Sequence, residues 1–471
     1  MVSKTRLWQT ALAISLATGL VQPHIAQATE SSEIVDPFAV IEALDQFAQQ
    51  QLWPGFDPRL HPIAIYDGEK TLLLRHPNPP EGFTPLVGQE RTWALEGRHQ
   101  AMRWNSTASI GGELTATLML TIEPGRAVEL EASYLLHEVF HLYSKPGHPS
   151  WRPDEMARYS YPVDSEENFY LLILEEEALA RAVEADRPEA AANWAATALA
   201  VRERRIEQLD PEHLAYEIAL EMQEGTAVYM ARLAVNDVRD IARLREGVAP
   251  EKIRWRFYDT GAALAALLDP FDPRWKNRLE AAPETTLAGL LGTALTERRI
   301  GVAGFTSDEL NTLRQRAESG IAELAAKRRQ LRDDLASRAI RVVVISGIGS
   351  DPLQVRPGAF DPLALEVLDR GEILHYGRMT LVTSAGHVVY KNPSYERRVV
   401  AGVLALTTPV GDRHPLLDGF SRIIITGFTE RPRVQHREGE VLIEAEGLEV
   451  RFRGAELGVS EKEIIVRLPD R

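Results

Sequence analysis

The sequence predicts an α+β fold, and three observations along its 471 residues support this prediction. Residues 62–122 contain short apolar runs bounded by turn-forming Gly, Pro and Asp, which is typical of strands. Residues 127–339 mostly place apolar residues three and four apart, as the buried face of a helix requires. After residue 340, short β-branched runs return. We therefore expect a mostly helical region between an N-terminal β-sheet and a β-rich C-terminal domain.

The first 28 residues have the pattern of a secretory signal peptide. Lys4 and Arg6 precede an apolar stretch from Leu7 to Val21, and Ala26-Gln27-Ala28 offers a small-x-small cleavage site. The apolar stretch is shorter than the roughly 20 residues that a membrane-spanning helix needs. The sequence therefore predicts an exported protein, periplasmic or extracellular, with no transmembrane segment in the mature chain.

Composition excludes several classes of site and partner. The chain has 44% hydrophobic and 26% charged residues, which is ordinary for a folded protein, and it has no cysteine. Disulfides, thiolate metal sites and a cysteine nucleophile are therefore excluded. The formal net charge of −15 makes nucleic acid an unfavourable partner. Composition does not indicate an oligomeric state.

Residues 29–126 form an N-terminal α+β region in this prediction, with strands that flank the site described below. A helix is expected from Asp36 to Leu52, because apolar side chains recur on one of its faces. The expected strands flank the turn Asp67-Gly68 and cover His99–Trp104 and Glu113–Ile122.

Residues 127–305 are expected to form a helical domain, and residues 306–339 one long connecting helix. Thr306 and Glu309 have the spacing of a capping box at the start of that helix. Residues 340–471 would form the β-rich domain. The expected helices of the domain cover Ala127–Ser144, Glu166–Ala185, Pro188–Gln208, Pro211–Val235, Arg254–Leu268 and Leu279–Leu295. The histidines of the β-rich domain are scattered and suggest no shared site: His375, His387 and His414.

The segment "LLHEVFHLYS" contains the strongest chemical signal in the chain. His137 and His141 are four residues apart, so a helix places both on one face. Glu138 lies about 100° around the helix from His137, within reach of a water on the same metal ion. Two imidazoles and an adjacent carboxylate at this spacing are typical of a catalytic zinc site.

The residues around this motif matter as much as the motif. Apolar side chains surround it on almost every side, which predicts a buried helix: Leu135, Leu136, Val139, Phe140, Leu142 and Tyr143. Two imidazoles and a carboxylate buried together need partners, because burying unpaired polar groups is costly. A metal ion is the simplest common partner.

A catalytic zinc site requires a third protein ligand. The later segment "YEIALEMQEGTAVYMARLAV" carries Glu217, Glu221 and Glu224 on one face of an expected helix. Glu224 is followed by Gly225, which allows a second backbone to approach closely. We therefore select Glu224 as the third ligand, with Glu221 as its alternative.

These residues resemble the gluzincins, the zincin metallopeptidases that combine HExxH with a glutamate ligand on a later helix. The segment Glu224-Gly225-Thr226-Ala227 resembles the Glu-Gly-x-Ala pattern often found there. The resemblance covers about residues 105–268. It implies a zincin-like catalytic domain in which His137, His141 and Glu224 bind Zn²⁺ and Glu138 is the base.

Other polar residues compete for secondary roles. Glu221, or one of Glu175, Glu176 and Glu177, could accept a hydrogen bond from a ligand histidine. His148 is interpreted as a loop residue, because it falls one position late for the metzincin histidine pattern. The candidates for an oxyanion donor are Tyr229, Arg256 and Tyr258, and Tyr258 is the one we select as catalytic, with a core or capping role as its alternative.

The resemblance also implies a β-strand edge beside the metal, to which a peptide can add as an extra strand. Residues Asn105 to Gly112, just before the strand Glu113–Ile122, are expected to form a loop that contacts substrate.

The sequence thus predicts zinc-dependent hydrolysis of peptide bonds by a metal-bound water, with Glu138 as general base and a peptide or protein as substrate. Two alternatives remain. The first is a zincin-like protein that binds metal without hydrolysis. The second is an envelope binding or adhesion protein that acts through residues 340–471.

Overall fold

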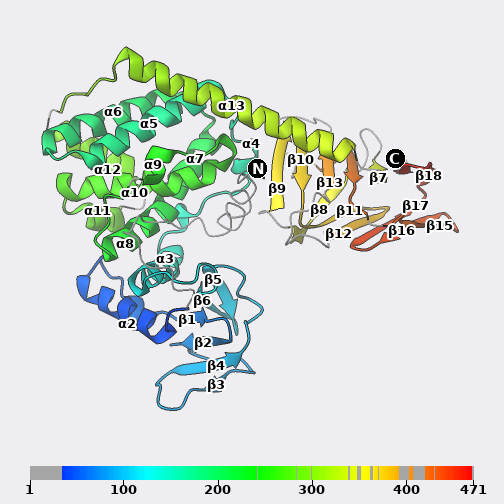
Figure 1. Ribbon diagram of the computed structural model, residues 1–471, viewed down its shortest axis with the longest axis horizontal. Coiled ribbons are helices and arrows are strands. Elements are labelled where there is room, and N and C mark those ends of the chain that lie inside the picture. The colour runs from blue at the N-terminus through cyan, green and yellow to red at the C-terminus, as the bar shows by residue number, and fades with distance from the viewer. Residues whose placement is uncertain are drawn as a thin grey trace, which may run out of the picture. The chain divides into compact units, whose positions relative to one another are not determined.

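The computed structural model describes residues 34–468 apart from 241, 283, 299, 338–339, 347–351, 361–363, 370, 392–402, 407–418 and 429. Helices and sheets both occur, so the fold is α+β (Figure 1). The chain divides into two compact units, residues 1–158 with 162–321 and residues 159–161 with 322–471. The expected signal peptide, residues 1–28, and His414 lie outside the described residues. Among the described helices, none combines the length and the apolar character needed to cross a membrane.

The first unit begins with helix α2 (Pro37–Phe47), followed by a six-stranded sheet. The Asp36 carboxylate caps α2 by accepting a hydrogen bond from the Phe38 amide at 3.0 Å. The strand order is β3-β4-β2-β1-β6-β5, and β1 and β6 are parallel while the other pairs are antiparallel. The strands are β1 (Ile63–Tyr66), β2 (Lys70–Leu74), β3 (Thr84–Pro85), β4 (Thr92–Glu96), β5 (Ser106–Ile110) and β6 (Glu113–Met119).

Two expectations for this region are wrong. Residues His99–Trp104 form no strand, because the Met102 amide bonds the His99 carbonyl at 2.9 Å and closes a turn. The expected loop at Asn105–Gly112 is largely strand β5, which pairs with β6 across a turn at Gly111 and Gly112. Both glycines have positive φ, 57° and 86°, which glycine adopts without strain. Strand β5 pairs with β6 alone, so it forms one edge of the sheet.

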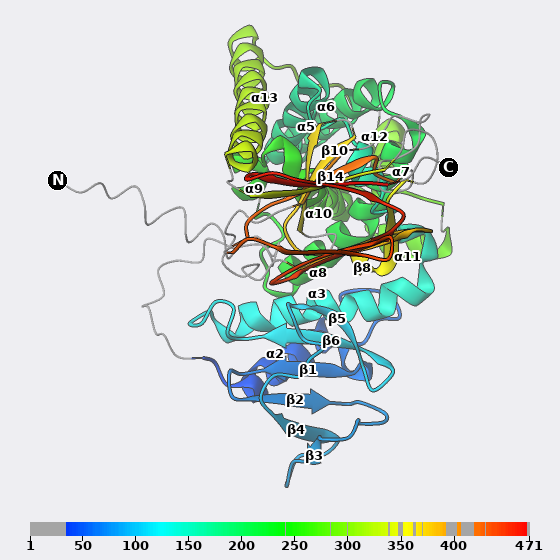
Figure 2. The same cartoon turned by 90° about the vertical axis from the view of Figure 1, so that its right-hand side faces the viewer.

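Helices make up the rest of the first unit. Helix α3 (Val128–Gly147) lies along the sheet beside β5 and β6 (Figure 2). Helix α4 (Ala157–Ser160) is shared, because its last two residues belong to the second unit. The other segments are η4 (Pro149–Trp151), α5 (Glu166–Glu184), α6 (Pro188–Ile206), α7 (Pro211–Leu220), η5 (Glu221–Gly225), α8 (Thr226–Ala234), α9 (Ala242–Glu246), η6 (Pro250–Lys252), α10 (Ile253–Phe271), α11 (Trp275–Ala281) and α12 (Leu287–Glu297).

The expected helix Leu279–Leu295 is wrong, because two helices, α11 and α12, divide that segment. Ala282, which follows α11, has a non-helical backbone with φ −136° and ψ 89°. The next residue in the sequence is Pro283, and a residue before proline is disfavoured in the helical region. Helix α12 then starts again at Leu287, where the Thr286 hydroxyl caps the Gly289 amide at 3.0 Å.

Helix α13 (Ser307–Ala336) occupies most of the expected connecting helix. The capping box at its start is confirmed: the Thr306 amide donates to the Glu309 carboxylate at 2.7 Å, and the Glu309 amide donates to the Thr306 hydroxyl at 3.3 Å. The division between the two units falls inside this helix, at residues 321 and 322. The C-terminal part of α13 therefore belongs to the second unit.

The second unit contains two sheets, in the orders β18-β19-β7-β14-β13-β10-β9 and β15-β16-β17-β12-β11-β8. Within it, Leu335 of α13 packs against Leu368 and Leu374. The strands are β7 (Arg341–Ile345), β8 (Gln354–Phe360), β9 (Leu365–Asp369), β10 (Glu372–His375), β11 (Arg378–Thr383), β12 (Gly386–Lys391), β13 (Val403–Leu406), β14 (Arg422–Ile425), β15 (Arg433–Arg437), β16 (Glu440–Ala445), β17 (Leu448–Arg453), β18 (Glu456–Val459) and β19 (Glu463–Arg467).

Candidate metal centre

Helix α3 is buried along most of its length, as its apolar sequence predicts. Only 2% of the His137 surface and 4% of the His141 surface is exposed. Phe140, on the same helix, packs edge-on against Trp53 and Phe56 with ring centroids 5.1 and 5.3 Å apart. This packing fixes the helix, and therefore the direction of the two imidazoles.

The expected helix Pro211–Val235 contains a π-helical turn, η5, between α7 and α8. Glu224 lies in this turn. A π-turn holds about one more residue than an α-turn, so it changes the direction of the side chains that follow. The angle around the helix axis between the Glu221 and Glu224 side chains is therefore larger than it would be in a regular α-helix.

The close backbone approach expected at Gly225 is confirmed. A Cβ atom added to Gly225 would lie 2.5 Å from the Cα of Gly261 on α10, and one added to Gly261 would lie 2.7 Å from the Glu221 carbonyl oxygen. Only glycine at both positions allows the two helices to cross at this distance. The crossing holds the π-turn against α10.

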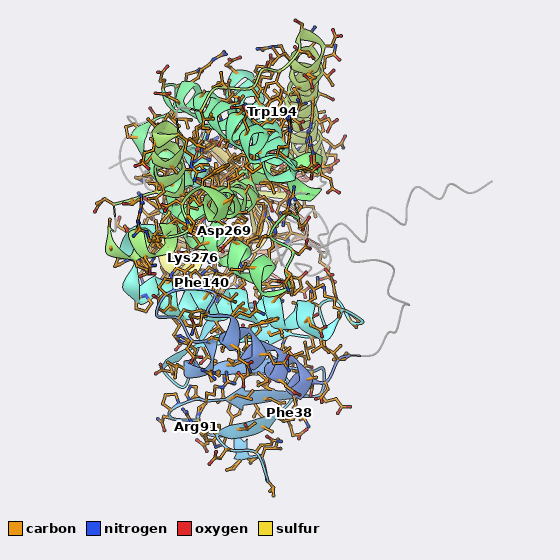
Figure 3. The ribbon with its side chains drawn as sticks, turned by 90° about the vertical axis from the view of Figure 1, so that its left-hand side faces the viewer. Phe38, Arg91, Phe140, Trp194, Asp269 and Lys276 are labelled. Carbon is orange, nitrogen blue, oxygen red and sulfur yellow. The ribbon has the colours of Figure 1, made fainter. Side chains whose placement is uncertain are left out.

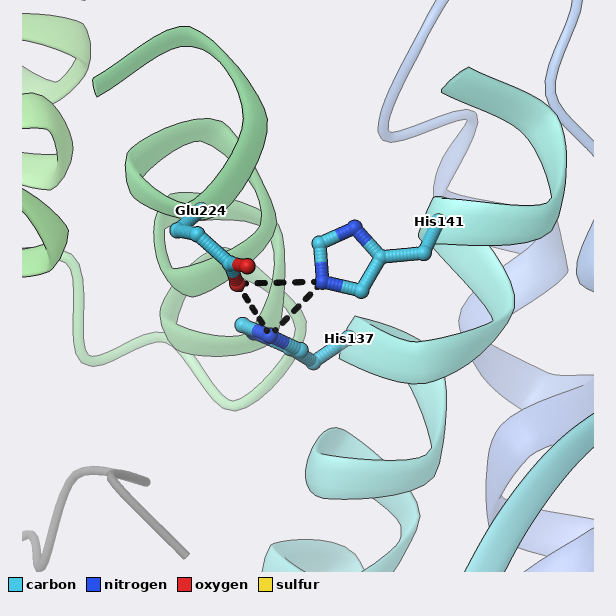
Figure 4. A group of neighbouring side chains, drawn as sticks. All are labelled: His137, His141 and Glu224. Atoms are coloured by element: carbon cyan, nitrogen blue, oxygen red, sulfur yellow. Dashed lines mark hydrogen bonds and ion pairs between the residues drawn. The ribbon is translucent and has the colours of Figure 1, made fainter. Parts of the chain in front are cut away.

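Three ligand atoms from α3 and η5 converge on one point (Figure 4). The His137 and His141 Nε2 atoms are 3.2 Å apart, and Oε2 of Glu224 lies 3.4 Å from the first and 3.1 Å from the second. A tetrahedral zinc ion with bonds near 2.05 Å separates its ligand atoms by about 3.3 Å. The three atoms therefore fit the bond lengths of zinc, and they could hold a metal ion.

The two oxygens of Glu224 have different partners. Oε2 faces the two imidazoles, while Oε1 accepts hydrogen bonds from Arg254 Nη2 and Gln223 Nε2, each at 3.1 Å. The carboxylate is thus held by its outer oxygen, while its inner oxygen is directed at the two imidazoles, where a metal ion could bind. Sequence reasoning missed Arg254 and Gln223, although Arg254 lies one helical turn before Tyr258.

Protonation favours metal binding at these residues. Burial lowers the pKa of His141 to about 4, so its imidazole is neutral at neutral pH. Burial acts to raise the pKa of Glu224, but the neighbouring histidines and the Arg254 guanidinium prevail and hold it well below its ordinary value. A neutral imidazole and an ionised carboxylate are the forms that bind a metal.

The outer nitrogens of the two histidines have no hydrogen-bond partner within the part of the chain that the structure describes. This applies to Nδ1 of both His137 and His141, which are buried. The carboxylates expected to accept from them are engaged with arginines elsewhere. Glu175 bonds Arg202 and Arg205, Glu176 pairs with Arg256, and Glu177 pairs with Arg181 and Arg245.

Glu221, the alternative to Glu224, is held by a buried arginine. Both of its oxygens accept from Arg202, and the Thr260 hydroxyl donates to it at 2.7 Å. Arg205 makes the same two-pronged contact with Glu217, at 2.6 and 2.7 Å. Of the three glutamates that the sequence places on one face, only Glu224 reaches the histidines.

Glu138 is buried beside the three ligands, with 6% of its surface exposed. Burial raises its pKa to about 7, opposed by His137, Lys145 and Arg254 and reinforced by Glu224. A carboxyl group that titrates near neutral pH is suited to accept and return a proton.

Of the three expected oxyanion donors, only Tyr258 lies at the centre. Its ring stacks near that of His137, with centroids 6.4 Å apart, and its hydroxyl contacts the Arg254 guanidinium. Burial raises the pKa of Tyr258 well above its ordinary value, so the hydroxyl stays protonated and can donate.

The other expected candidates have structural partners. The Tyr229 hydroxyl donates to both oxygens of Asp269 at 2.9 Å, and Asp269 is labelled in Figure 3. Arg256 pairs with Glu176 at 2.9 Å. His148 bonds Glu280 at 3.2 Å and stacks on Trp151.

Comparison with known proteins provides no relative. No protein-family model matches the chain, and neither the curated proteins nor the solved structures contain a match. The chemistry of the site therefore rests on its own geometry.

Proposed function

We propose that this protein is an exported, zinc-dependent peptidase of the gluzincin type. The observation that supports it best is the convergence of His137 Nε2, His141 Nε2 and Glu224 Oε2 within 3.1–3.4 Å of one another. Zinc is favoured over magnesium or calcium because two of the three ligand atoms are imidazole nitrogens. Three protein ligands leave a coordination position open, as in catalytic zinc sites.

Bound zinc would polarise the scissile carbonyl and acidify a water molecule. Glu138 would accept a proton from the attacking water and pass it to the leaving amine, a role that suits a carboxyl group with a pKa of about 7. Tyr258 would donate its hydroxyl proton to the developing oxyanion, while Arg254 holds that hydroxyl in place. Arg254 and Gln223 would orient Glu224 through its outer oxygen.

The edge strand β5 supports a peptide as substrate. β5 pairs with β6 on one side only, and helix α3, which carries the two histidines, packs against both strands. An extended peptide could add to β5 by main-chain hydrogen bonds, which recognise a backbone independently of its sequence. This arrangement would bring a peptide bond close to the metal ligands.

The test combines metal content with one conservative change. We expect the purified protein to hold one zinc ion per chain, measured by elemental analysis, and to cleave an unfolded protein substrate. Glu138→Gln should keep the zinc and reduce kcat by about 10²–10⁴-fold, because it removes only the proton acceptor. Proteolysis that survives this change would contradict the mechanism.

The same experiment separates the two alternatives. A protein that binds zinc but cleaves nothing would be the non-catalytic zincin-like protein. A protein that holds no zinc would favour a binding function in residues 340–471.

A further inference from the structure

Lys145 extends the row of functional residues on helix α3. It follows His141 by four residues and Glu138 by seven, so all three share one face of the helix. The helix was expected to end near Ser144 but continues to Gly147. The helix therefore places Lys145 one turn beyond His141, on the face that carries the metal ligands.

The ammonium of Lys145 also reaches the expected peptide-binding edge. Its Nζ atom donates to the Thr107 hydroxyl on β5 at 2.8 Å. Thr107 is the second residue of that edge strand and pairs with Ala116 on β6. Lys145 thus connects the metal-bearing helix with the strand along which a peptide would lie.

Lys145 has spare hydrogen-bonding capacity, unlike Arg254. Arg254 uses all three nitrogens, contacting Glu155 through Nε, Tyr258 through Nη1 and Glu224 through Nη2. No carboxylate among the described residues lies within ion-pairing distance of Lys145, whose partner is a neutral hydroxyl. An ammonium has three donors, so two remain for a ligand.

The electrostatic surroundings of Lys145 favour an additional anion. The Lys145 side chain is exposed, and four charged groups act on it: Glu138 and Glu224 favour its charge, while the guanidinium groups of Arg152 and Arg254 oppose it. Three cations thus act together at this end of the centre. A ligand carboxylate at Lys145 would offset the mutual repulsion of the three cations.

We propose that Lys145 binds a carboxylate group of a peptide that lies along β5, and that it makes the enzyme selective for such substrates. The proposal rests on the proposed peptidase function. The carboxylate could be the C-terminus of the peptide, as in a carboxypeptidase, or an acidic side chain. Both sources have the same chemistry at Lys145, and the experiment distinguishes them.

The first test measures binding, so that it does not depend on turnover. The zinc-loaded full-length Glu138→Gln protein is titrated with fluorescein-labelled hexapeptides. One is a neutral peptide amide, the second has a free C-terminal carboxylate, and the others are amides with a single glutamate at each position in turn. We expect one acidic form to bind about tenfold more tightly than the neutral amide, since a charge-assisted hydrogen bond is gained.

Substitutions at Lys145 then test the source of this preference. Lys145→Met should reduce the ratio of acidic to neutral affinity to about one, whereas Lys145→Arg should keep most of it. Lys391→Met is the matched control, because it removes the same charge from an exposed position on β12 and should leave the ratio unchanged. The ratio cancels any general effect of the substitution on the centre.

The outcomes separate this proposal from the peptidase function. Equal affinity for neutral and acidic peptides, or a preference that survives Lys145→Met, would overturn the carboxylate site. Cleavage of neutral and acidic peptides at equal rates by the wild-type protein would do the same while the peptidase function stands. A preference that depends on Lys145, in a protein that cleaves no peptide, would support the carboxylate site and refute the peptidase function.

Discussion

Glu221 and Glu224 are three residues apart in one helical segment, both are almost fully buried, and yet they have opposite surroundings. Glu221 has a buried arginine, Arg202, on both of its oxygens and a hydroxyl from Thr260. Glu224 has Arg254 and Gln223 on one oxygen only, and its other oxygen faces two imidazoles.

The difference separates buried polar groups whose partners lie within the protein from a group that could hold a metal ion. The Arg202 and Arg205 network is complete within the protein, so its carboxylates need no external partner. The histidine centre gathers three ligand atoms, and the Nδ1 atoms of its two imidazoles have no hydrogen-bond partner among the described residues. A buried group of this kind is a candidate site for a metal ion.

The strongest test of this comparison exchanges Glu224 for a neutral isostere. Glu224→Gln should weaken zinc binding by about 10³-fold or more, since each ligand supplies a large share of the binding free energy. Proteolysis should fall below detection. Zinc affinity is measured by competition with a chromophoric chelator. Zinc binding at wild-type affinity would show that the third ligand is another residue.

Removing an arginine from the Arg202 and Arg205 network should lower the stability of the fold and leave zinc binding intact. Arg202→Met leaves the carboxylates of Glu175 and Glu221 buried without their main partner, so the free energy of unfolding should fall by about 3–4 kcal/mol. Urea unfolding measures this change, and the folded protein should retain its zinc.

Arg204 provides the control on the same helix. Its pair with Glu167 is exposed, with 60% and 36% of the two side chains accessible, so Arg204→Met should cost less than about 0.5 kcal/mol. Equal losses in the two variants would contradict the distinction between the buried network and the surface.

Gly225 directly follows Glu224 in the chain and lies where this helical segment crosses α10. Gly225→Ala would place a Cβ atom 2.5 Å from Gly261, where only backbone could move, so we expect a loss of about 3 kcal/mol in the free energy of unfolding. Gly292→Ala in α12 is the control. Its nearest neighbour would be a Leu199 methyl at 3.7 Å, and alanine should stabilise that helix by up to about 1 kcal/mol.

Another buried carboxylate, Glu131 near the start of α3, has only a long ion pair with an arginine. Arg126 is 3.7 Å away, and burial raises the pKa of Glu131 to about 7. The folded protein therefore holds this proton more tightly than the unfolded chain, so stability decreases as pH rises from about 4.5 to about 7.

Glu131→Gln should remove that contribution. The variant should gain about 2 kcal/mol relative to the wild type between pH 5 and pH 8, measured by urea unfolding at each pH. Glu129→Gln, at an exposed position in the same helical turn, should leave the pH dependence unchanged. A constant difference between Glu131→Gln and wild type across this range would contradict the expectation.

Local sequence patterns predicted the helices and caps better than they predicted which residues the polar side chains contact. The buried helix with His137 and His141 and the capping box at Thr306 follow from nearby residues alone. A strand is expected at His99–Trp104, but the bonds of the His99 backbone and side chain to nearby amides favour a turn. The partners of the expected donors, such as Asp269 for Tyr229, come from distant parts of the chain.

The sequence by itself determined that two imidazoles and a carboxylate lie buried on one helix, because helical spacing and apolar flanks are local properties. It also determined that Glu217, Glu221 and Glu224 share one helical segment. Only the tertiary structure decided which of the three reaches the histidines. The π-turn changes the direction of Glu224, and Arg202 and Arg205 of α6 bind the other two glutamates. A choice among like residues depends on which charges the packing of distant helices places beside each of them.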